Sequence, residues 1–161
     1  MKQCDRWKEY TQAGEFIKLV DSVDWLLFPK NEHTKGIIHS DITFDNLIFN
    51  NDTVYILDYG DVGVGWLLMD LSISILSLAI VNKSFVEEIV RQILLGYRSV
   101  SLLNDREYEN LGEFIKLACL RKCSAYYDYF QNRNILIKKY DLYLDAMSFL
   151  PSIEEKIKEC L

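Results

Sequence analysis

Apolar residues recur every three or four positions along most of the chain, the spacing that places side chains on one face of an α-helix. Ser84 and Glu87 have the spacing of a capping box, which opens such a run. The apolar positions of that run are Val86, Ile89, Val90, Ile93, Leu94 and Tyr97. The expected helices cover, approximately, residues 7–27, 69–80, 84–97, 105–130, 135–147 and 151–160, and Asp105 can cap the fourth of them. The chain is therefore predicted to be mainly helical.

Residues 62–81 are almost uncharged over a length that could cross a membrane. Asp70 lies near the middle, however, and a central carboxylate costs about 3 kcal/mol on membrane insertion. The glycines near the start of the segment indicate that its first third is a loop. We therefore expect a buried core helix over about 69–80 and no membrane association. Its serines, Ser72, Ser74 and Ser77, can bond to backbone carbonyls or to neighbouring loops.

Two short β-prone runs, 46–49 and 54–57, flank four residues typical of a turn, Asn-Asn-Asp-Thr at 50–53. This pattern predicts a β-hairpin with Asn46 at its start and Asp58 at its end. Both side chains then lie at the same end of the paired strands. His39 and Asp41 fall in the loop immediately before, so we expect all four polar groups to converge.

These residues suit phosphoryl transfer. His39, Asp41 and Asn46 are spaced as H-x-D-x-x-x-x-N, and Asp58 opens a D-Y-G sequence twelve positions later. Asp and Asn offer the oxygen ligands that Mg²⁺ takes, and a further Asp could orient or deprotonate a hydroxyl group. An isolated His-x-Asp is usually only a hydrogen-bonded pair, but Asn46 and Asp58 at these intervals favour a phosphotransfer site.

The motifs resemble those of the aminoglycoside phosphotransferase/choline kinase family, whose members have a protein-kinase-like fold. The resemblance rests on HSDITFDN at 39–46, ILDYGD at 56–61 and MDL at 69–71. It implies that Asp41 is the catalytic base, that Asn46 and Asp58 bind Mg²⁺ and the ATP phosphates, and that His39 is structural. It also implies that Asp70 supports the catalytic loop from the start of the next helix.

The chain departs from the family pattern in ways that remove no liganding oxygen. Ser40 stands where the family often has Gly, Phe44-Asp45 replaces Pro-Gly, and Tyr59 replaces the usual Phe. Two other functions stay open. A carboxylate-metal hydrolase could gather Asp41, Asp45, Asp58 and Asp61 around a divalent metal. A degenerate kinase-like lobe could instead act as a non-catalytic interaction module.

The composition indicates the number of domains and excludes some functions. A chain of 161 residues is expected to form one domain, here 1–161, and half of its residues are hydrophobic. The net charge of −6 argues against nucleic-acid binding, which needs a basic face. Cys119 and Cys123 are four positions apart, the spacing of one helix face, and are expected to lie in the hydrophobic core. Reduced thiols and a cytoplasmic location are the default expectation.

A kinase-like enzyme also needs an N-terminal lobe with a Gly-rich loop and a strand-borne Lys over the phosphates. Only 35 residues precede the motif region, and they read as helix and loop. We therefore expect an α+β, mainly helical C-terminal lobe without its nucleotide-binding N-terminal lobe, either a truncated product or one half of a split enzyme. Such a lobe would be inactive alone and would need a separate N-lobe chain or a homodimer. The implied reaction passes a phosphoryl group from ATP, with Mg²⁺, to a small-molecule hydroxyl. The acidic balance and the tyrosines of 126–129 would suit a cationic acceptor, although helix packing explains these tyrosines more simply.

Overall fold

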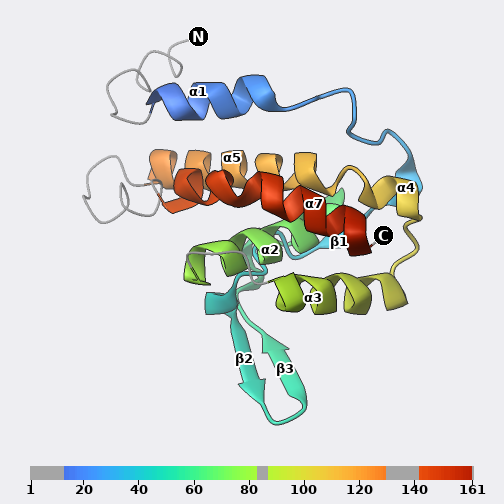
Figure 1. Ribbon diagram of the computed structural model, residues 1–161. Helices are drawn as coiled ribbons and strands as arrows, with labels where there is room; N and C mark the ends of the chain where they lie inside the picture. Colours follow the sequence, from blue (N-terminus) through green and yellow to red (C-terminus); the bar gives the residue numbers. More distant parts are fainter. Residues whose placement is uncertain (1–12, 83–86, 130–141, 161) are drawn as a thin grey trace.

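The computed structural model describes residues 13–82, 87–129 and 142–160, which form a mainly helical structure with two small antiparallel sheets (Figure 1). The helices are α1 (Ala13–Ser22), α2 (Leu68–Asn82), α3 (Glu87–Val100), α4 (Asp105–Tyr108), α5 (Leu111–Tyr129) and α7 (Leu150–Cys160). The strands are β1 (Lys35–Ile38), β2 (Leu47–Asn50), β3 (Thr53–Ile56) and β4 (Gly63–Trp66). Short 3-10 turns are η2 (Glu32–Thr34), η3 (Phe44–Asn46), η4 (Tyr59–Asp61) and η5 (Met147–Phe149). The predicted combination of helices with a small β element is confirmed.

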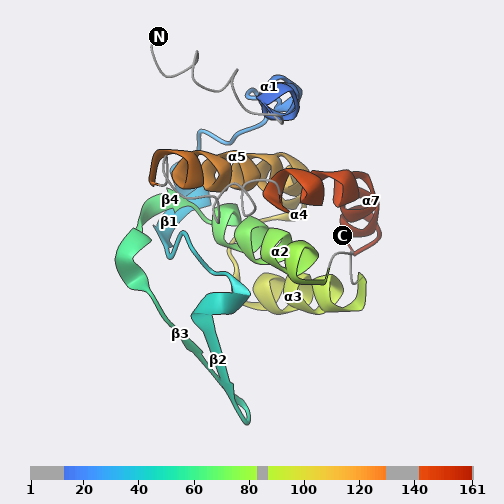
Figure 2. The same cartoon turned by 90° about the vertical axis from the view of Figure 1, so that its left-hand side faces the viewer.

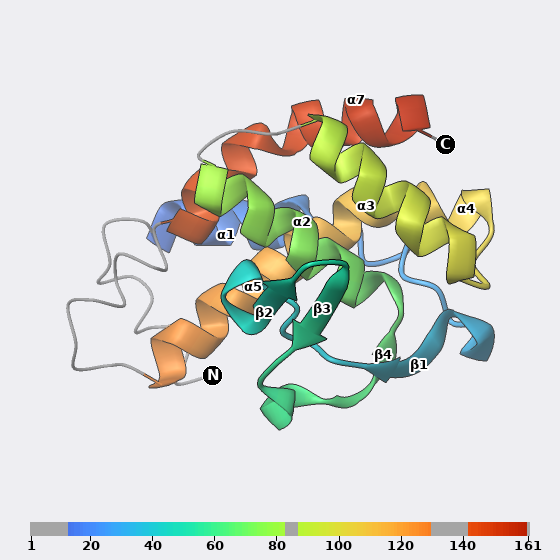
Figure 3. The ribbon, with the colours of Figure 1, turned by 90° about the horizontal axis from the view of Figure 1, so that it is seen from below.

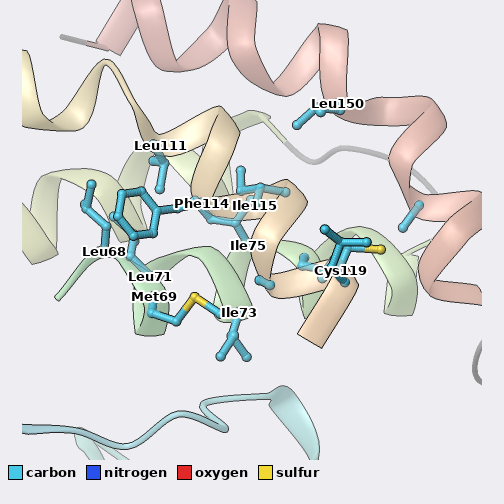
Figure 4. Packing of buried hydrophobic residues seen from close by; sticks show 14 of the residues in the cluster. Leu68, Met69, Leu71, Ile73, Ile75, Leu111, Phe114, Ile115, Cys119 and Leu150 are labelled. Atoms are coloured by element: carbon cyan, nitrogen blue, oxygen red, sulfur yellow. The ribbon is translucent and has the colours of Figure 1, made fainter. Parts of the chain in front are cut away.

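The centre of the core is the contact between α2 and α5 (Figure 4). Leu71 and Ile75 from α2 meet Phe114 and Ile115 from α5, and each of the four is at most 2% exposed. A helix that is apolar on nearly all sides must be covered on nearly all sides, and α3 and η3 also pack against α2. The prediction of a buried core helix is thus confirmed. None of the helices formed by the described residues combines the length and hydropathy that crossing a bilayer requires.

The two sheets are nested along the chain. β2 pairs with β3 from Leu47–Ile56 to Asn50–Thr53, which forms the predicted hairpin. β1, which precedes the hairpin in the sequence, pairs with β4, which follows it, and Ile38 lies opposite Gly63. Figure 2 shows the β2–β3 hairpin extending away from the helices, whereas β1 and β4 lie close to the helices, and Figure 3 shows from below the hairpin in front of the helices. The two loops between the sheets, 39–46 and 57–62, are therefore brought together.

Two predicted helix boundaries are wrong, for local reasons. The first helix ends at Ser22 rather than near residue 27, because the Asp24 carboxylate accepts a hydrogen bond from the N–H of Leu26 and stabilises a turn instead. The predicted helix over 105–130 is split into α4 and α5. Its cap is Asn104, not Asp105, because Asn104 and Glu107 form a reciprocal capping box.

Other predictions fall partly outside the described residues. These are the start of the first helix before residue 13, the Ser84 half of the first capping box, and most of the helix expected over 135–147. The side chains of residues 126–129 are also outside the description, although α5 extends through them.

Candidate active site

The candidate residues lie where the two sheets meet. His39 follows β1 directly, Asn46 ends η3 immediately before β2, and Asp58 lies two residues after β3. The N–H of Leu57 donates to the carbonyl oxygen of Asn46 at 2.8 Å, which joins the two loops. Asp58 has a left-handed backbone conformation with φ of 60°, which turns the chain sharply after β3. The hairpin places Asn46 and Asp58 at one end, as the sequence predicts.

Asp70, in the first turn of α2, holds the backbone of the loop. Its Oδ2 accepts a hydrogen bond from the N–H of His39 at 2.8 Å, and its Oδ1 accepts one from the N–H of Ser40 at 2.7 Å. Ser40 has a positive φ of 68°, a strained conformation for this residue type that the surrounding bonds must maintain. Both carboxylate oxygens thus fix successive backbone amides next to Asp41.

The His39 ring connects the two loops. Its Nε2 lies 3.0 Å from the carbonyl oxygen of Leu57, and its Nδ1 accepts from the N–H of Asp41 at 3.2 Å. This network assigns the proton to Nε2, since a carbonyl can only accept. The ring is buried and lies 4.9 Å, centroid to centroid, from Tyr59, the residue that replaces Phe in the motif.

Serines of α2 bind the rest of the loop, as the sequence predicts. The Ser74 hydroxyl lies 3.0 Å from the carbonyl oxygen of Ile42, and the Ser77 hydroxyl accepts from the N–H of Phe44 at 3.1 Å. The backbone of residues 39–44 is therefore attached to α2 at four points, two from Asp70 and one from each serine.

The carboxylate of Asp41 does not project freely into solvent, because both of its oxygens have partners. Its Oδ1 forms an ion pair with Nζ of Lys122, and its Oδ2 accepts from Nδ2 of Asn46 at 3.0 Å. The same Asn46 nitrogen donates to the Asp41 carbonyl oxygen at 2.9 Å. The side chain of Asp41 is 24% exposed and that of Lys122 is 10% exposed.

Sequence reasoning missed two basic residues of α5. Arg121, next to Lys122, donates to the carbonyl oxygen of Ser40 and forms a 3.0 Å ion pair with Asp61. Both basic residues lie about eighty positions beyond the loop, so no local pattern reveals the contact. One signal was present: Lys122 falls three residues after Cys119 and one before Cys123, so it lies on the buried side of α5.

A cavity of about 330 Å³ opens beside Asp41. It is lined by Asp41, Thr43, Asp45, Asn46, Ser77, Ile80, Val81, Leu142 and Tyr143. Polar groups therefore come from the loop and from Ser77 of α2, and apolar side chains come from the end of α2 and from residues 142 and 143.

A family model described as the phosphotransferase enzyme family matches residues 1–110. This match covers more than half of the chain. The chain belongs to the phosphotransferase enzyme family. A search among curated proteins found no match. The family match includes both sheets, the loops between them and α2, and it ends just before α5.

Phosphotransferases of this family generally use ATP and Mg²⁺, so the donor set can be tested for fit. Asn46 uses its amide nitrogen on Asp41, which leaves its oxygen without a partner among the described residues. Within the part of the chain that the structure describes, the Asp58 carboxylate accepts one long hydrogen bond, at 3.4 Å, from the N–H of Gly60. These oxygens suit Mg²⁺, but two residues alone make an incomplete octahedron that nucleotide phosphates and water would have to complete.

The arrangement does not favour the carboxylate-metal hydrolase. Within the described residues, no group of three or more His, Cys, Asp or Glu side chains is placed to hold a metal ion. Of the four carboxylates that this alternative needs, Asp41 is paired with Lys122 and Asp61 with Arg121. Two of the four carboxylates are thus bound to cations of α5 rather than to a shared metal position.

Proposed function

We propose that this chain supplies the catalytic and metal-binding side of an ATP-dependent phosphotransferase that acts on the hydroxyl group of a small molecule. The observation that carries the proposal is the meeting of Asp41, Asn46 and Asp58 between two nested sheets. The loop that bears Asp41 is held by the two backbone hydrogen bonds to Asp70. Membership of the phosphotransferase family supports the reaction class.

In this proposal Asp41 is the general base. An acceptor hydroxyl in the adjoining cavity donates a hydrogen bond to the Asp41 carboxylate, which takes the proton as the acceptor oxygen bonds to the γ-phosphorus of ATP. The bond from that phosphorus to its bridging oxygen breaks, and ADP leaves. Positioning is the main contribution of the protein, and both Asp41 oxygens are already oriented by Asn46 and Lys122.

Asn46 and Asp58 would hold the magnesium ion. Bound there, Mg²⁺ would neutralise charge on the phosphate oxygens. The two Nδ2 bonds of Asn46 fix the orientation of its amide, so its oxygen faces away from Asp41. The roles of His39 and Asp70 in this proposal are to hold the loop in place.

The cavity favours an acceptor with an apolar body and a cationic group. Ile80, Leu142 and Tyr143 offer apolar surface, while Asp45 is an exposed carboxylate with no hydrogen bond or ion pair among the described residues. An ammonium group near Asp45 would place a hydroxyl of a small amino alcohol within the same cavity as Asp41. The net charge of −6 would also attract cations.

The nucleotide would be covered from the other side by a second unit. Among the described residues, the β2–β3 hairpin contains no glycine, and the one lysine on a strand, Lys35 of β1, forms a 3.0 Å ion pair with Glu32. The hairpin meanwhile exposes apolar side chains, including Phe49 (62% exposed) and Tyr55 (52% exposed). Such surface suits packing against another lobe, supplied as a separate chain or by a second copy of this one.

The test measures transfer from γ-labelled ATP to a set of amino alcohols and neutral alcohols, by the full chain alone and with an N-lobe of a related phosphotransferase, fused or added. We expect transfer only with the added lobe and Mg²⁺, and preferentially to amino alcohols. Asp41→Asn should abolish transfer and Asp58→Asn should abolish Mg-ATP binding, while the exposed control Asp21→Asn on α1 should behave as wild type.

The alternatives give different results. Transfer that survives both Asp41→Asn and Asp58→Asn would refute the assigned roles. Asp58-dependent nucleotide binding without transfer to any acceptor would favour the non-catalytic module. Robust Asp41-dependent transfer by the chain alone would show that no second unit is needed.

A further inference from the structure

Helix α5 lies beyond the family match, yet it presents two cations to the loops of the site. Lys122 pairs with Asp41, and Arg121 pairs with Asp61. Neither of the carboxylates that α5 binds is a proposed metal ligand. The proposed ligand Asp58, by contrast, is paired with neither Arg121 nor Lys122. The cations therefore divide the acidic residues of the site into two groups.

This division matters because Asp41 lies directly beside a proposed metal ligand. Its Oδ2 is 3.0 Å from Nδ2 of Asn46. A carboxylate is a better ligand for a hard divalent cation than an amide oxygen is, because it carries charge. An unrestrained Asp41 would compete with Asn46 for the metal, and a metal-bound carboxylate is a poor acceptor for a hydroxyl proton.

The placement of Lys122 prevents that competition. Its side chain is only 10% exposed, so the ammonium group depends on Asp41 to compensate for its lost hydration. Its positive charge also repels a divalent cation from that side of the carboxylate. Since Asn46 and Lys122 take different oxygens, the carboxylate is held from both ends in one orientation.

We propose that Lys122 is a positioning residue that keeps the Asp41 carboxylate out of the metal coordination shell. The inference rests on the proposed function, because it takes Asn46 and Asp58 as the metal ligands. It assigns to α5 a role in separating the base from the metal.

The test is the affinity of the full chain for Mn²⁺, measured by electron paramagnetic resonance of the free ion. Lys122→Met should tighten Mn²⁺ binding about fivefold to tenfold, because Asp41 is released as an additional charged ligand. Lys122→Arg should keep the wild-type affinity, and adding Asp41→Asn to Lys122→Met should return it to the wild-type value. The matched control is Lys116→Met, which removes another lysine of α5, 15% exposed and paired with Glu113.

Several results would overturn the inference. One is an unchanged or weaker Mn²⁺ affinity in a folded Lys122→Met protein, and another is the absence of Mn²⁺ binding in every variant. If Lys122→Met does not fold, Asp41→Asn alone decides: with Lys122 present it should not weaken Mn²⁺ binding, and a weakening would mean that Asp41 is already a ligand. If Asp58→Ala leaves the Mn²⁺ affinity unchanged, the proposed metal ligands are refuted. Failure of the proposed function can therefore be distinguished from failure of the inference about Lys122.

Discussion

The loop 39–46 and the hairpin 47–56 are adjacent in sequence but are held in opposite ways. The loop is fixed by side chains of two distant helices: Asp70 and two serines of α2, and Arg121 and Lys122 of α5. The hairpin bonds mainly to itself through its ladder and exposes apolar side chains on strands that leave the helical body.

The difference shows how the chain distributes its stability. The loop carries the proposed base on a backbone with a strained residue, and long-range bonds maintain that strain. The hairpin needs only its own turn to form, but a two-stranded sheet is marginally stable by itself. Precision in the loop and accessible apolar surface on the hairpin are compatible with a site completed by a second unit.

The largest difference in stability should come from shortening an apolar side chain in the helical core and one on the hairpin. Ile75→Ala removes a fully buried side chain of α2 and should lower the free energy of unfolding by about 2–5 kcal/mol. Phe49→Ala removes a larger side chain from the exposed hairpin and should change it by no more than about 0.5 kcal/mol. Urea unfolding followed by circular dichroism measures both. A large loss with Phe49→Ala would mean that the hairpin is already packed, for example in a dimer.

A smaller effect is expected from removing the support of the loop. Asp70→Ala leaves the N–H groups of His39 and Ser40 without their acceptor and should cost about 1–3 kcal/mol. Asp70→Asn keeps one acceptor oxygen, so its free energy of unfolding should lie between those of the wild type and Asp70→Ala. The exposed carboxylate variant Asp45→Ala should leave stability unchanged.

Hydrogen exchange shows where that effect acts. In Asp70→Ala the amides of His39 and Ser40 should exchange faster, while the amide of Tyr55 in the hairpin should not change. Equal acceleration in both regions would contradict the separation of loop and hairpin.

The smallest effect concerns pH. Tyr97 donates to the carbonyl oxygen of Leu67, just before α2, at 2.7 Å. Burial first, and then the charges of Tyr108 and Asp70, raise the pKa of Tyr97 from 10.0 to about 12. A raised pKa in the folded state contributes stability that is present below pH about 10 and is lost as the pH rises through about 12.

Thermal unfolding between pH 8 and 12 tests this. Tyr97→Phe should flatten the decline of Tm above pH 10, whereas Tyr55→Phe on the exposed hairpin should follow the wild type. A decline as steep in Tyr97→Phe as in the wild type would exclude this tyrosine as a source of alkaline destabilisation.

Local signals explain what the sequence could predict. The turn residues 50–53 predict the hairpin, and the nearly uncharged run around Asp70 predicts the core helix. The spacing of Asp41, Asn46 and Asp58 predicts that they lie close together, since a hairpin brings its two ends to one place.

The sequence could not predict the contacts that depend on tertiary pairing. The partners of Asp41 and Asp61 lie on one helix, 81 and 60 positions later, and sequence spacing carries no information about such a pairing. The cap was predicted one residue too late because Asn104 and its neighbour Asp105 are both of residue types that cap helices well. The break between α4 and α5 lies farther along, where the carbonyl oxygen of Asn110 accepts hydrogen bonds from the N–H groups of Glu113 and Phe114 as α5 begins.

The contact of Lys122 with Asp41 also sets an order of events during synthesis. The two residues are separated by 81 positions, so at about 5–20 residues per second the ribosome takes roughly 4–16 s to add the second after the first. Throughout that interval the nascent chain carries the loop without its cations. The carboxylate would reach its final environment only when α5 docks on α2, so the site would mature late, with the completed core.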